Sequence, residues 1–293
     1  MDGTLGAGGH ASGLLEASAP DGQLLGLDVD PQALELARRT LAPFGERARL
    51  MHASYASLAG QLTALGWESV DGILLDLGAS SMQFDTPQRG FSFLADGPLD
   101  MRFDPSNPLT AAQIVNEWSE TELAQVLYRY GEEPASRRIA RAIVRARPVG
   151  GTRDLNAVIE KAIGRRRSPG SSTGRGPRNS ATQSFQALRI AVNSELDLVE
   201  ETLPLAVQAL APGGRLAVIA FHSLEDRLVK EYFRRESKDC LCPPKQPICT
   251  CGHKASIREI NRRPVTPSEQ EISQNPRARS AKLRIAERLP IHE

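Results

Sequence analysis

Apolar and polar positions follow two different periods along the first 80 residues. Short apolar runs, typical of buried parallel strands, are separated by segments whose apolar residues recur every three or four positions, as in helices. The predicted strands are 23–27, 49–52 and 70–75, and the predicted helices are 11–17, 31–41 and 58–65. Strands that alternate with helices in this way predict an α/β fold built on a parallel sheet.

The pattern changes after residue 76 and returns near residue 215. Residues 77–108 are rich in Gly, Ser, Pro and Asp and are predicted to form a loop. Helices are predicted over 110–163, with a break at 148–151, and over 185–210, before a strand at 215–221 and a helix at 225–235. A last strand is predicted within 275–287. A sheet that is interrupted and then resumed predicts an inserted helical domain, with domain ranges of 1–104, 105–195 and 196–293.

The net charge of +1 hides a strong asymmetry between these parts. Residues 1–104 carry 6 Lys and Arg against 14 Asp and Glu, whereas residues 137–189 carry 13 against 2. This one-sided excess of arginine favours contact with a nucleic acid. The alternative interpretation is a solvated arginine-rich helix face with a flexible loop. The candidate phosphate contacts are Arg137, Arg138, Arg141, Arg145, Arg165, Arg166 and Arg167.

Composition narrows the class of protein. Charged residues make up 24% and hydrophobic residues 40%, as in globular proteins. The longest apolar runs fall far short of the ~20 residues that span a bilayer, and no basic and apolar leader opens the sequence. Four cysteines do not make a disulfide framework at this length. We therefore expect a cytoplasmic protein with no membrane partner.

Glycines and acids cluster where the predicted strands end. The run from Asp2 to His10 reads DGTLGAGGH, and its glycines let the backbone approach a ligand at the start of a helix. Asp28 follows the predicted strand 23–27, where a carboxylate can accept both ribose hydroxyls, and Asp76 follows the predicted strand 70–75. The run lacks the dinucleotide fingerprint, and acidic surroundings suit a neutral or cationic nucleoside such as S-adenosylmethionine. The alternatives are a plain turn and, for Asp76, a helix N-cap.

Seven segments in order resemble the 16S ribosomal RNA (cytosine-N4)-methyltransferase family over almost the whole chain. They are DGTLGAGGH at 2–10, GLDVDPQAL at 26–34, DGILLDLGASSMQFD at 71–85, RGFSFLADGPLDMRFD at 89–104, FQALRIAVNSEL at 185–196, GGRLAVIAFHSLEDR at 213–227 and NPRARSAKLRIAE at 275–287. The resemblance implies a Rossmann-like class I methyltransferase sheet with an inserted all-helical domain. It also implies methyl transfer from S-adenosylmethionine to the N4 amine of a cytidine in the decoding region of 16S rRNA, with that rRNA or the small ribosomal subunit as partner.

The resemblance also assigns residues to the cofactor. Gly8, Gly9 and His10 would line its methionine end, Asp28 would take the ribose, Tyr55 would lie against the adenine, and Asp76 and Gln83 would complete the pocket. Asp28 and Asp76 follow from the residues alone as well. Tyr55 and Gln83 rest on the resemblance only.

The predicted catalytic residues follow from the chemistry of the target amine. Its lone pair is delocalised into the ring, so the enzyme must align the amine with the methyl group and accept an N–H hydrogen bond. We expect Asp76, Ser80 and Ser81 to serve the amine, although Asp76 could serve the cofactor alone. His222 follows a later strand and is a further candidate, whereas Ser223 is predicted to cap the next helix with Asp226 in a capping box.

The four cysteines lie in a compact C-x-C…C-x-C arrangement near the end of the chain. Cys240, Cys242, Cys249 and Cys251 could bind a structural Zn²⁺ through four thiolates, although the spacing is tighter than the usual C-x-x-C. Reduced, unligated thiols are the alternative. The zinc would lie away from the methyl transfer.

The glycine-rich turn begins at residue 3, whereas a central parallel strand should precede it. We therefore expect the first strand to be largely missing, the 293-residue form to be marginally stable with poor cofactor binding, and a form extended upstream to be the active one. Two other functions remain open. One is a small-molecule methyltransferase, and the other is a non-catalytic RNA-binding or ribosome-assembly protein that retains the fold. Calorimetry with S-adenosylmethionine separates the second from the enzyme.

Overall fold

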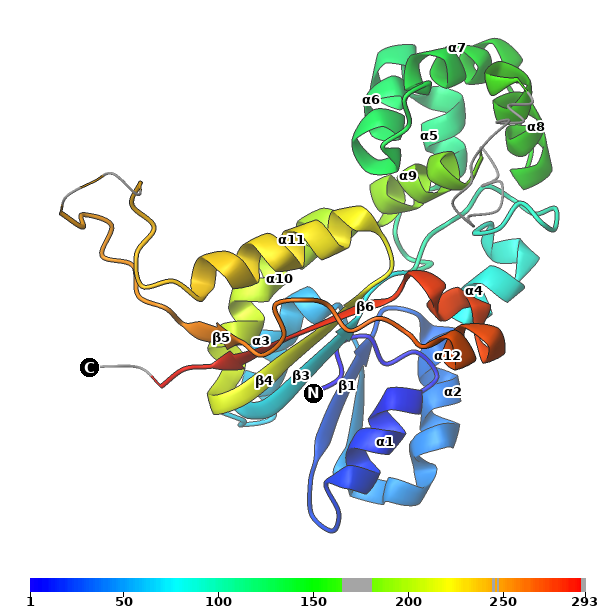
Figure 1. Ribbon diagram of the computed structural model, residues 1–293. Helices are drawn as coiled ribbons and strands as arrows, with labels where there is room; N and C mark the ends of the chain where they lie inside the picture. The colour runs from blue at the N-terminus through cyan, green and yellow to red at the C-terminus, as the bar shows by residue number, and fades with distance from the viewer. Residues whose placement is uncertain (165–180, 244–245, 247, 291–293) are drawn as a thin grey trace. The chain divides into compact units, whose positions relative to one another are not determined.

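The computed structural model describes residues 1–164, 181–243, 246 and 248–290 (Figure 1). The chain divides into two compact units. The first unit combines Met1–Gly78 with Leu196–Glu293, and the second is the continuous segment Ala79–Glu195. In these described ranges, the first unit contains two hydrophobic core clusters and the second unit contains one.

The first unit is built on a mostly parallel sheet. Its strands are β1 (Leu24–Asp28), β2 (Ala48–His52), β3 (Val70–Asp76), β4 (Leu210–Ala220), β5 (Ile257–Glu259) and β6 (Lys282–Arg288). β1 pairs with β2 and β3 pairs with β4 in parallel, whereas β6 runs antiparallel to both β4 and β5. The order β3-β4-β6-β5 therefore places the last strand of the sequence inside the sheet.

The first residues of the chain join the two halves of this sheet. Asp2 bridges in parallel to Gly26 of β1 and to Leu74 of β3. The Asp2 N–H donates to the Leu25 carbonyl at 2.9 Å, and the Leu74 N–H donates to the Met1 carbonyl at 2.9 Å. The expectation that the first strand is largely missing is confirmed, because the central position holds only the isolated bridges of Asp2, at its carboxyl end, and the described residues supply no strand there. Beyond them, a cavity of about 720 Å³ lies between the amino ends of β1 and β3.

The complete strand order is thus β2, β1, the first residues, β3, β4, β6 and β5. One antiparallel strand next to the end of an otherwise parallel sheet confirms the predicted Rossmann-like class I methyltransferase fold. The prediction of strands at 23–27, 49–52 and 70–75 agrees with β1, β2 and β3 to within a residue.

Helices cover both faces of the sheet. The helices of this unit are α1 (Gly9–Ala17), α2 (Pro31–Leu41), α3 (Leu58–Ala64), α10 (Glu195–Ala209), α11 (Ser223–Glu236) and α12 (Glu269–Gln274), with 3₁₀ turns η1 (Ala42–Arg47), η2 (Tyr55–Ser57) and η4 (Pro276–Ser280). α1 and α2 bury Leu15 and Leu34 in one core, and α3, α10 and α11 bury Leu58, Leu203 and Phe233 in another. The start of α2 has a local cause in the sequence. Asp30 caps this helix and Pro31 occupies its first position.

The second unit is helical. It contains α4 (Ser81–Asp85), the 3₁₀ turn η3 (Pro87–Arg89), α5 (Ala111–Glu117), α6 (Glu120–Gly131), α7 (Ser136–Ala146), α8 (Thr152–Ile163) and α9 (Ala181–Asn193). The segment 110–163, predicted to be helical with one break, forms the four helices α5, α6, α7 and α8. The side chains of Thr110 and Ser119 each accept a backbone N–H three residues on and start new helices through capping boxes.

The boundary between the units lies at residue 79 rather than at the predicted residue 105. Residues 79–104 look polar, yet Phe91, Leu99 and Met101 are buried in the helical core. Asn193 fixes this segment, because its Oδ1 accepts the Phe103 N–H at 2.7 Å and its Nδ2 donates to the Met101 carbonyl at 2.7 Å. The other boundary falls between Glu195 and Leu196. Among the described residues, no helix has the length and apolar character needed to cross a membrane.

Candidate active site

The glycine-rich turn follows the central position of the sheet and leads into α1. A Cβ atom at Gly3 would lie 2.6 Å from Leu75 Cδ2, so this position has no room for a side chain. Gly8 caps α1 with a φ of 85°, a conformation that side chains rarely adopt. A Cβ atom at Gly9 would meet nothing within 4 Å. The turn therefore presents open backbone at the start of α1, as expected for a ligand-binding turn.

Asp28 ends β1 and holds the turn in place. Its Oδ2 accepts the Gly6 N–H at 2.8 Å, and its Oδ1 accepts the Asp30 N–H at 2.8 Å. Burial raises the pKa of Asp28 above its usual range. Each carboxylate oxygen has a second lone pair, so Asp28 can accept further hydrogen bonds from a ligand while it fixes the turn.

Asp76 ends β3 on the same edge of the sheet. Its N–H donates to Thr4 Oγ1 at 2.6 Å, and its Oδ2 lies 3.5 Å from His10 Nε2. This pairing with Asp76 raises the pKa of His10 above its ordinary value. Asp76 Oδ1 is buried and has no hydrogen-bond partner within the described part of the chain. A buried carboxylate oxygen without a partner is costly, which points to a ligand that supplies one.

Asp2 is a site residue that the sequence analysis missed. It is 1% exposed, and burial raises its pKa to about 6. Its Oδ1 accepts the Thr4 N–H at 3.1 Å, whereas Oδ2 is buried without a partner among the described residues. The only signal in the sequence was an acid directly before the glycine-rich turn. Asp2 and Asp76 together make this end of the sheet anionic and suited to a cation.

Tyr55 also lies beside the glycine-rich turn. It opens η2 after β2, and a Cβ atom at Gly3 would lie 3.0 Å from Tyr55 Cβ. Its ring is half-buried and packs on the core under the sheet. The structure therefore brings Tyr55, Asp28 and Asp76 to the turn beside His10, and their contacts with a cofactor stay predictions.

Three predicted residues belong to the second unit. Ser80 and Gln83 form a capping box on α4, in which Ser80 Oγ accepts the Gln83 N–H at 3.3 Å and Gln83 Oε1 accepts the Ser80 N–H at 3.0 Å. Ser81 is the first residue of that helix. Their roles towards cofactor and amine stay predictions, since they belong to a different unit from Asp76.

His222 has a structural role that the sequence analysis assigned to its neighbour. His222, not Ser223, caps α11, and its Nδ1 accepts the Glu225 N–H at 3.4 Å. Glu225 is the third helical residue, and its Oε2 accepts the backbone N–H of Phe221 at 2.9 Å. Asp226, expected in the capping box, instead binds Lys282 and Arg284 of β6. The catalytic role predicted for His222 therefore stays a prediction beside an observed capping role.

The predicted arginines of the insert that the structure describes share one helix. Arg137, Arg138, Arg141 and Arg145 are all exposed on α7 and form what we call the α7 arginine face. The opposite side of α7 buries Ile139 and Ile143. Arg165, Arg166 and Arg167 lie outside the described residues.

A groove of about 880 Å³ runs along the α7 arginine face. Its walls come from α6 and α7 and include three of the four arginines together with Tyr128, which is 68% exposed. Glu120 pairs with Arg141 at 3.2 Å at one wall. The groove combines a cationic wall with an exposed aromatic ring.

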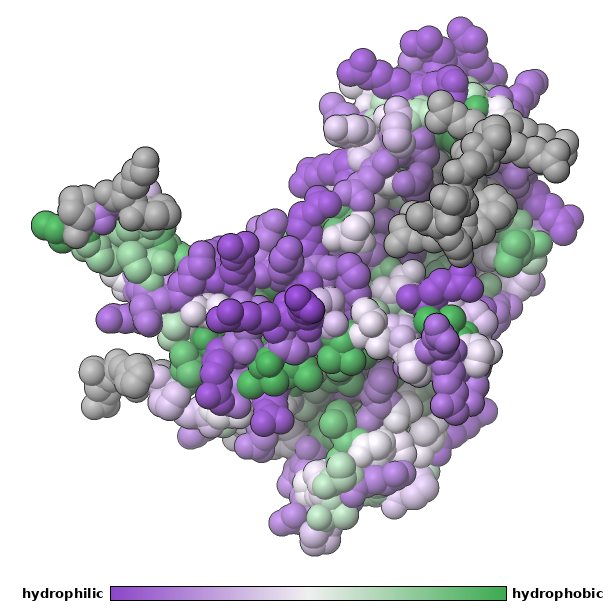
Figure 2. Space-filling model, in the orientation of Figure 1, coloured by the Kyte–Doolittle hydropathy of each residue, from purple (hydrophilic) through white to green (hydrophobic). Residues whose placement is uncertain are grey.

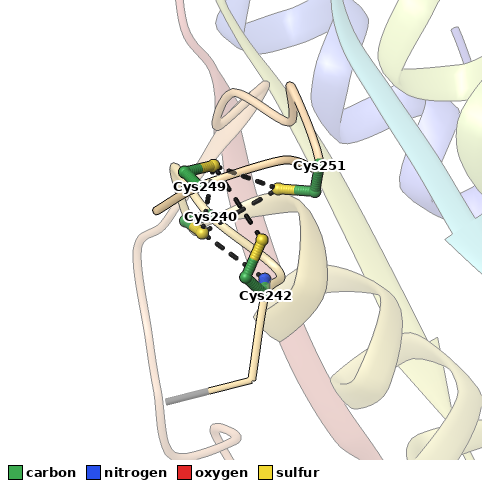
Figure 3. Close-up of side chains that lie close together, drawn as sticks. All are labelled: Cys240, Cys242, Cys249 and Cys251. Carbon is green, nitrogen blue, oxygen red and sulfur yellow. Dashed lines mark hydrogen bonds between the residues drawn. The ribbon is translucent and has the colours of Figure 1, made fainter. Parts of the chain in front are cut away.

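The four cysteines meet in the loop between α11 and β5 (Figure 3). Their sulfur atoms all lie within 4.8 Å of one another. The four cysteines therefore form a cluster, and the binding of a metal by this cluster stays a prediction.

Comparison with known proteins identifies the family to which the chain belongs. Ribosomal RNA small subunit methyltransferase H from Dehalococcoides mccartyi (strain BAV1) is 52% identical over 289 residues, covering 99% of this chain and 80% of that protein. Proteins of the same name from Thermomicrobium roseum and Heliobacterium mobile are 51% and 48% identical, covering 99% of this chain and 87% and 92% of their own lengths. The model of the MraW methylase family matches residues 1–289, and the chain belongs to this family.

Proposed function

We propose that this protein transfers a methyl group from S-adenosylmethionine to the N4 amine of a cytidine in the decoding region of 16S rRNA. The observation that carries the proposal is the anionic end of the sheet, where Asp2 Oδ2 and Asp76 Oδ1 are buried without partners in the described chain. S-adenosylmethionine is a nucleoside with a sulfonium and an ammonium group, and both cations suit this site. The relatives' name supplies the RNA as the substrate class.

The cofactor would extend along the carboxyl ends of the strands. The backbone of Gly8, Gly9 and His10 at the start of α1, which is open at Gly9, would hold its methionine carboxylate. Asp28 would accept the ribose hydroxyls, because its carboxylate has more lone pairs than the backbone N–H groups that it accepts in the turn. Tyr55, next to Gly3, would lie against the adenine.

The reaction is a direct displacement at the methyl carbon. The amine nitrogen forms a bond to that carbon, the carbon–sulfur bond breaks, and the sulfonium becomes a neutral thioether. The nitrogen would then lose one proton to water, which leaves a neutral methylated amine. Asp76 would accept an N–H hydrogen bond as attack begins and so localise the lone pair on nitrogen. The same role is proposed for Ser80 and Ser81 from the sequence alone. Asp2 would strengthen the anionic field at the sulfonium.

Methyl transfer to purified RNA tests this proposal. Small ribosomal subunits that lack the modification are incubated with the protein and labelled S-adenosylmethionine, and nucleosides are identified by mass spectrometry. We expect label in N4-methylcytidine, and a large loss of rate on Asp76→Ala. Asp71→Ala is the matched control, because Asp71 is an exposed carboxylate on the same strand. Label on another nucleoside, or none with the cofactor bound, would refute the proposal.

The substrate would contact the insert through the α7 arginine face. Arginines that neutralise phosphates give affinity that falls with salt, and an exposed aromatic ring can stack on an unpaired base. Tyr128 lies in the groove beside three of these arginines. A single-stranded segment of the rRNA therefore suits this groove better than a duplex, whose bases are already stacked.

The substrate indicates the cell compartment. Ribosomal subunits are cytoplasmic in bacteria, the source of the relatives compared above, so we place the protein in the cytoplasm.

The rival function is a non-catalytic RNA-binding or assembly protein. The buried carboxylate oxygens without partners in the described chain favour the enzyme, because burying them destabilises the fold unless a cofactor supplies their hydrogen bonds.

A further inference from the structure

The loop between α11 and β5 has little conventional structure to hold it. α11 ends at Glu236 and β5 begins at Ile257, and the described residues between them form neither helix nor strand. Apolar side chains in this loop are turned outward, since Leu241 is 41% exposed and Ile248 is 75% exposed. A loop of this length without a core of its own is uncommon unless something else fixes it.

All four cysteine side chains of this loop point toward one another (Figure 3). The Sγ atom of Cys249 lies 3.4 Å from that of Cys240, 4.0 Å from that of Cys242 and 3.6 Å from that of Cys251. The Sγ atoms of Cys240 and Cys251 are 3.8 Å apart. The chain contains only these four cysteines, so its whole complement of thiols is gathered in one place.

These separations match a tetrahedral metal site. Zn–S bonds of about 2.3 Å at tetrahedral angles place the sulfurs about 3.8 Å apart, at the centre of the observed range. Disulfide sulfurs would lie about 2.05 Å apart, so no pair here has that geometry. A sphere of zinc size fits among four sulfurs that are spaced in this way.

Backbone amides surround the sulfurs as they do in thiolate sites. The Leu241 N–H donates to Cys251 Sγ at 3.3 Å, and the Thr250 N–H donates to Cys242 Sγ at 3.4 Å. The Cys242 N–H donates to Cys240 Sγ at 3.4 Å. Such donors stabilise negative charge on sulfur and orient the ligands. Gly252 follows the last cysteine with a φ of 63°, which lets the chain turn away at once.

We propose that Cys240, Cys242, Cys249 and Cys251 bind one structural Zn²⁺ ion. Four thiolates close the coordination sphere and leave no position for substrate, so the ion holds the loop and takes no part in methyl transfer. It ties together two short arms of the loop, each with two ligands. The base of the loop is closed separately, because the Ser256 N–H donates to the Glu236 carbonyl at 2.9 Å. The zinc would therefore fix the tip.

Metal analysis of the full chain tests the proposal. The protein is purified under reducing conditions without added metal, and its metals are measured by mass spectrometry. We expect about one zinc ion per chain, and loss of most of it in the double variant Cys240→Ser with Cys249→Ser. Thr250→Ala is the matched control, because it removes a loop side chain and keeps the backbone donor to Cys242.

Two further measurements make the outcome decisive. Cobalt added to the metal-free protein should give the thiolate-to-metal charge-transfer absorption of a tetrahedral sulfur site, and the double variant should not. Limited proteolysis should cut the loop faster after chelation, while the control stays protected. Wild-type protein that carries no metal and gives no cobalt absorption would overturn the proposal. So would stoichiometric iron in place of zinc, or disulfides in the freshly purified chain.

Discussion

The buried carboxylate of Asp2 predicts an unusual dependence of stability on pH. Burial raises its pKa from 3.8 to about 6 in the folded protein. A group whose pKa is raised on folding contributes stability below its unfolded pKa and loses it as the pH rises through the folded pKa. The first unit should therefore lose stability from this group between about pH 4 and pH 7, in a protein without bound cofactor.

The magnitude follows from the shift. Each pKa unit corresponds to about 1.36 kcal/mol, so a shift from 3.8 to about 6 gives about 3 kcal/mol in total, most of it between pH 4 and pH 7. In Asp2→Asn this term disappears. The amide has its own buried cost, but that cost is the same at every pH. The difference in the free energy of unfolding between wild type and Asp2→Asn should therefore change by about 2 kcal/mol across this range, in favour of the variant at pH 7.

Urea unfolding at several pH values measures this difference. Trp67 lies in the first unit and Trp118 in the second, so a Trp118→Phe background makes fluorescence report on the first unit alone. Asp21→Asn is the control, because Asp21 is exposed and should leave the pH dependence unchanged. Parallel curves for wild type and Asp2→Asn would show that the Asp2 carboxylate is not desolvated, and would remove the argument for an anionic cofactor site.

Three further predictions rest on other contacts. Asp28→Ala should weaken the binding of S-adenosylmethionine by about 1.5–3 kcal/mol in calorimetry, the value of charge-assisted hydrogen bonds, and unchanged affinity would contradict its role at the ribose. Alanine at all four positions of the α7 arginine face should flatten the salt dependence of RNA binding by roughly one log–log unit per lost phosphate contact, with cofactor affinity unchanged; an unaltered slope would mean a merely solvated face. Asp226→Ala should cost about 3–5 kcal/mol in unfolding experiments because it leaves Arg284 buried and unpaired, and a loss under 1 kcal/mol would show that the pair is not desolvated.

The sequence predicted the sheet well where local signals agree. Val70–Asp76 is apolar, ends in an acid and follows a helix, and it forms β3 within one residue of the prediction. Asp28 and Asp76 follow from the same logic, because side chains at the carboxyl ends of parallel strands meet at one edge. Their approach to the glycine-rich turn is present in the structure.

The features that were missed depend on contacts between distant residues. Asp2 has a raised pKa only because it pairs between β1 and β3, which no local pattern reveals. Residues 79–104 look like a polar loop, but a few apolar side chains, Phe91 among them, pack into the helical core. His222 was passed over as a cap because its ring nitrogen accepts the amide hydrogen bond that serine usually takes.

The position of β6 between β4 and β5 also affects how the chain folds while the ribosome is still synthesising it. β4 is synthesised about 60 residues before its second neighbour, and until residues 282–288 emerge its outer edge has no strand to pair with. β5 depends on the same strand. A nascent chain that stalls before this point would present two unsatisfied edges, a template for pairing with other chains. Aggregation during interrupted synthesis should therefore depend more on the arrival of β6 than on the amount of sheet already made.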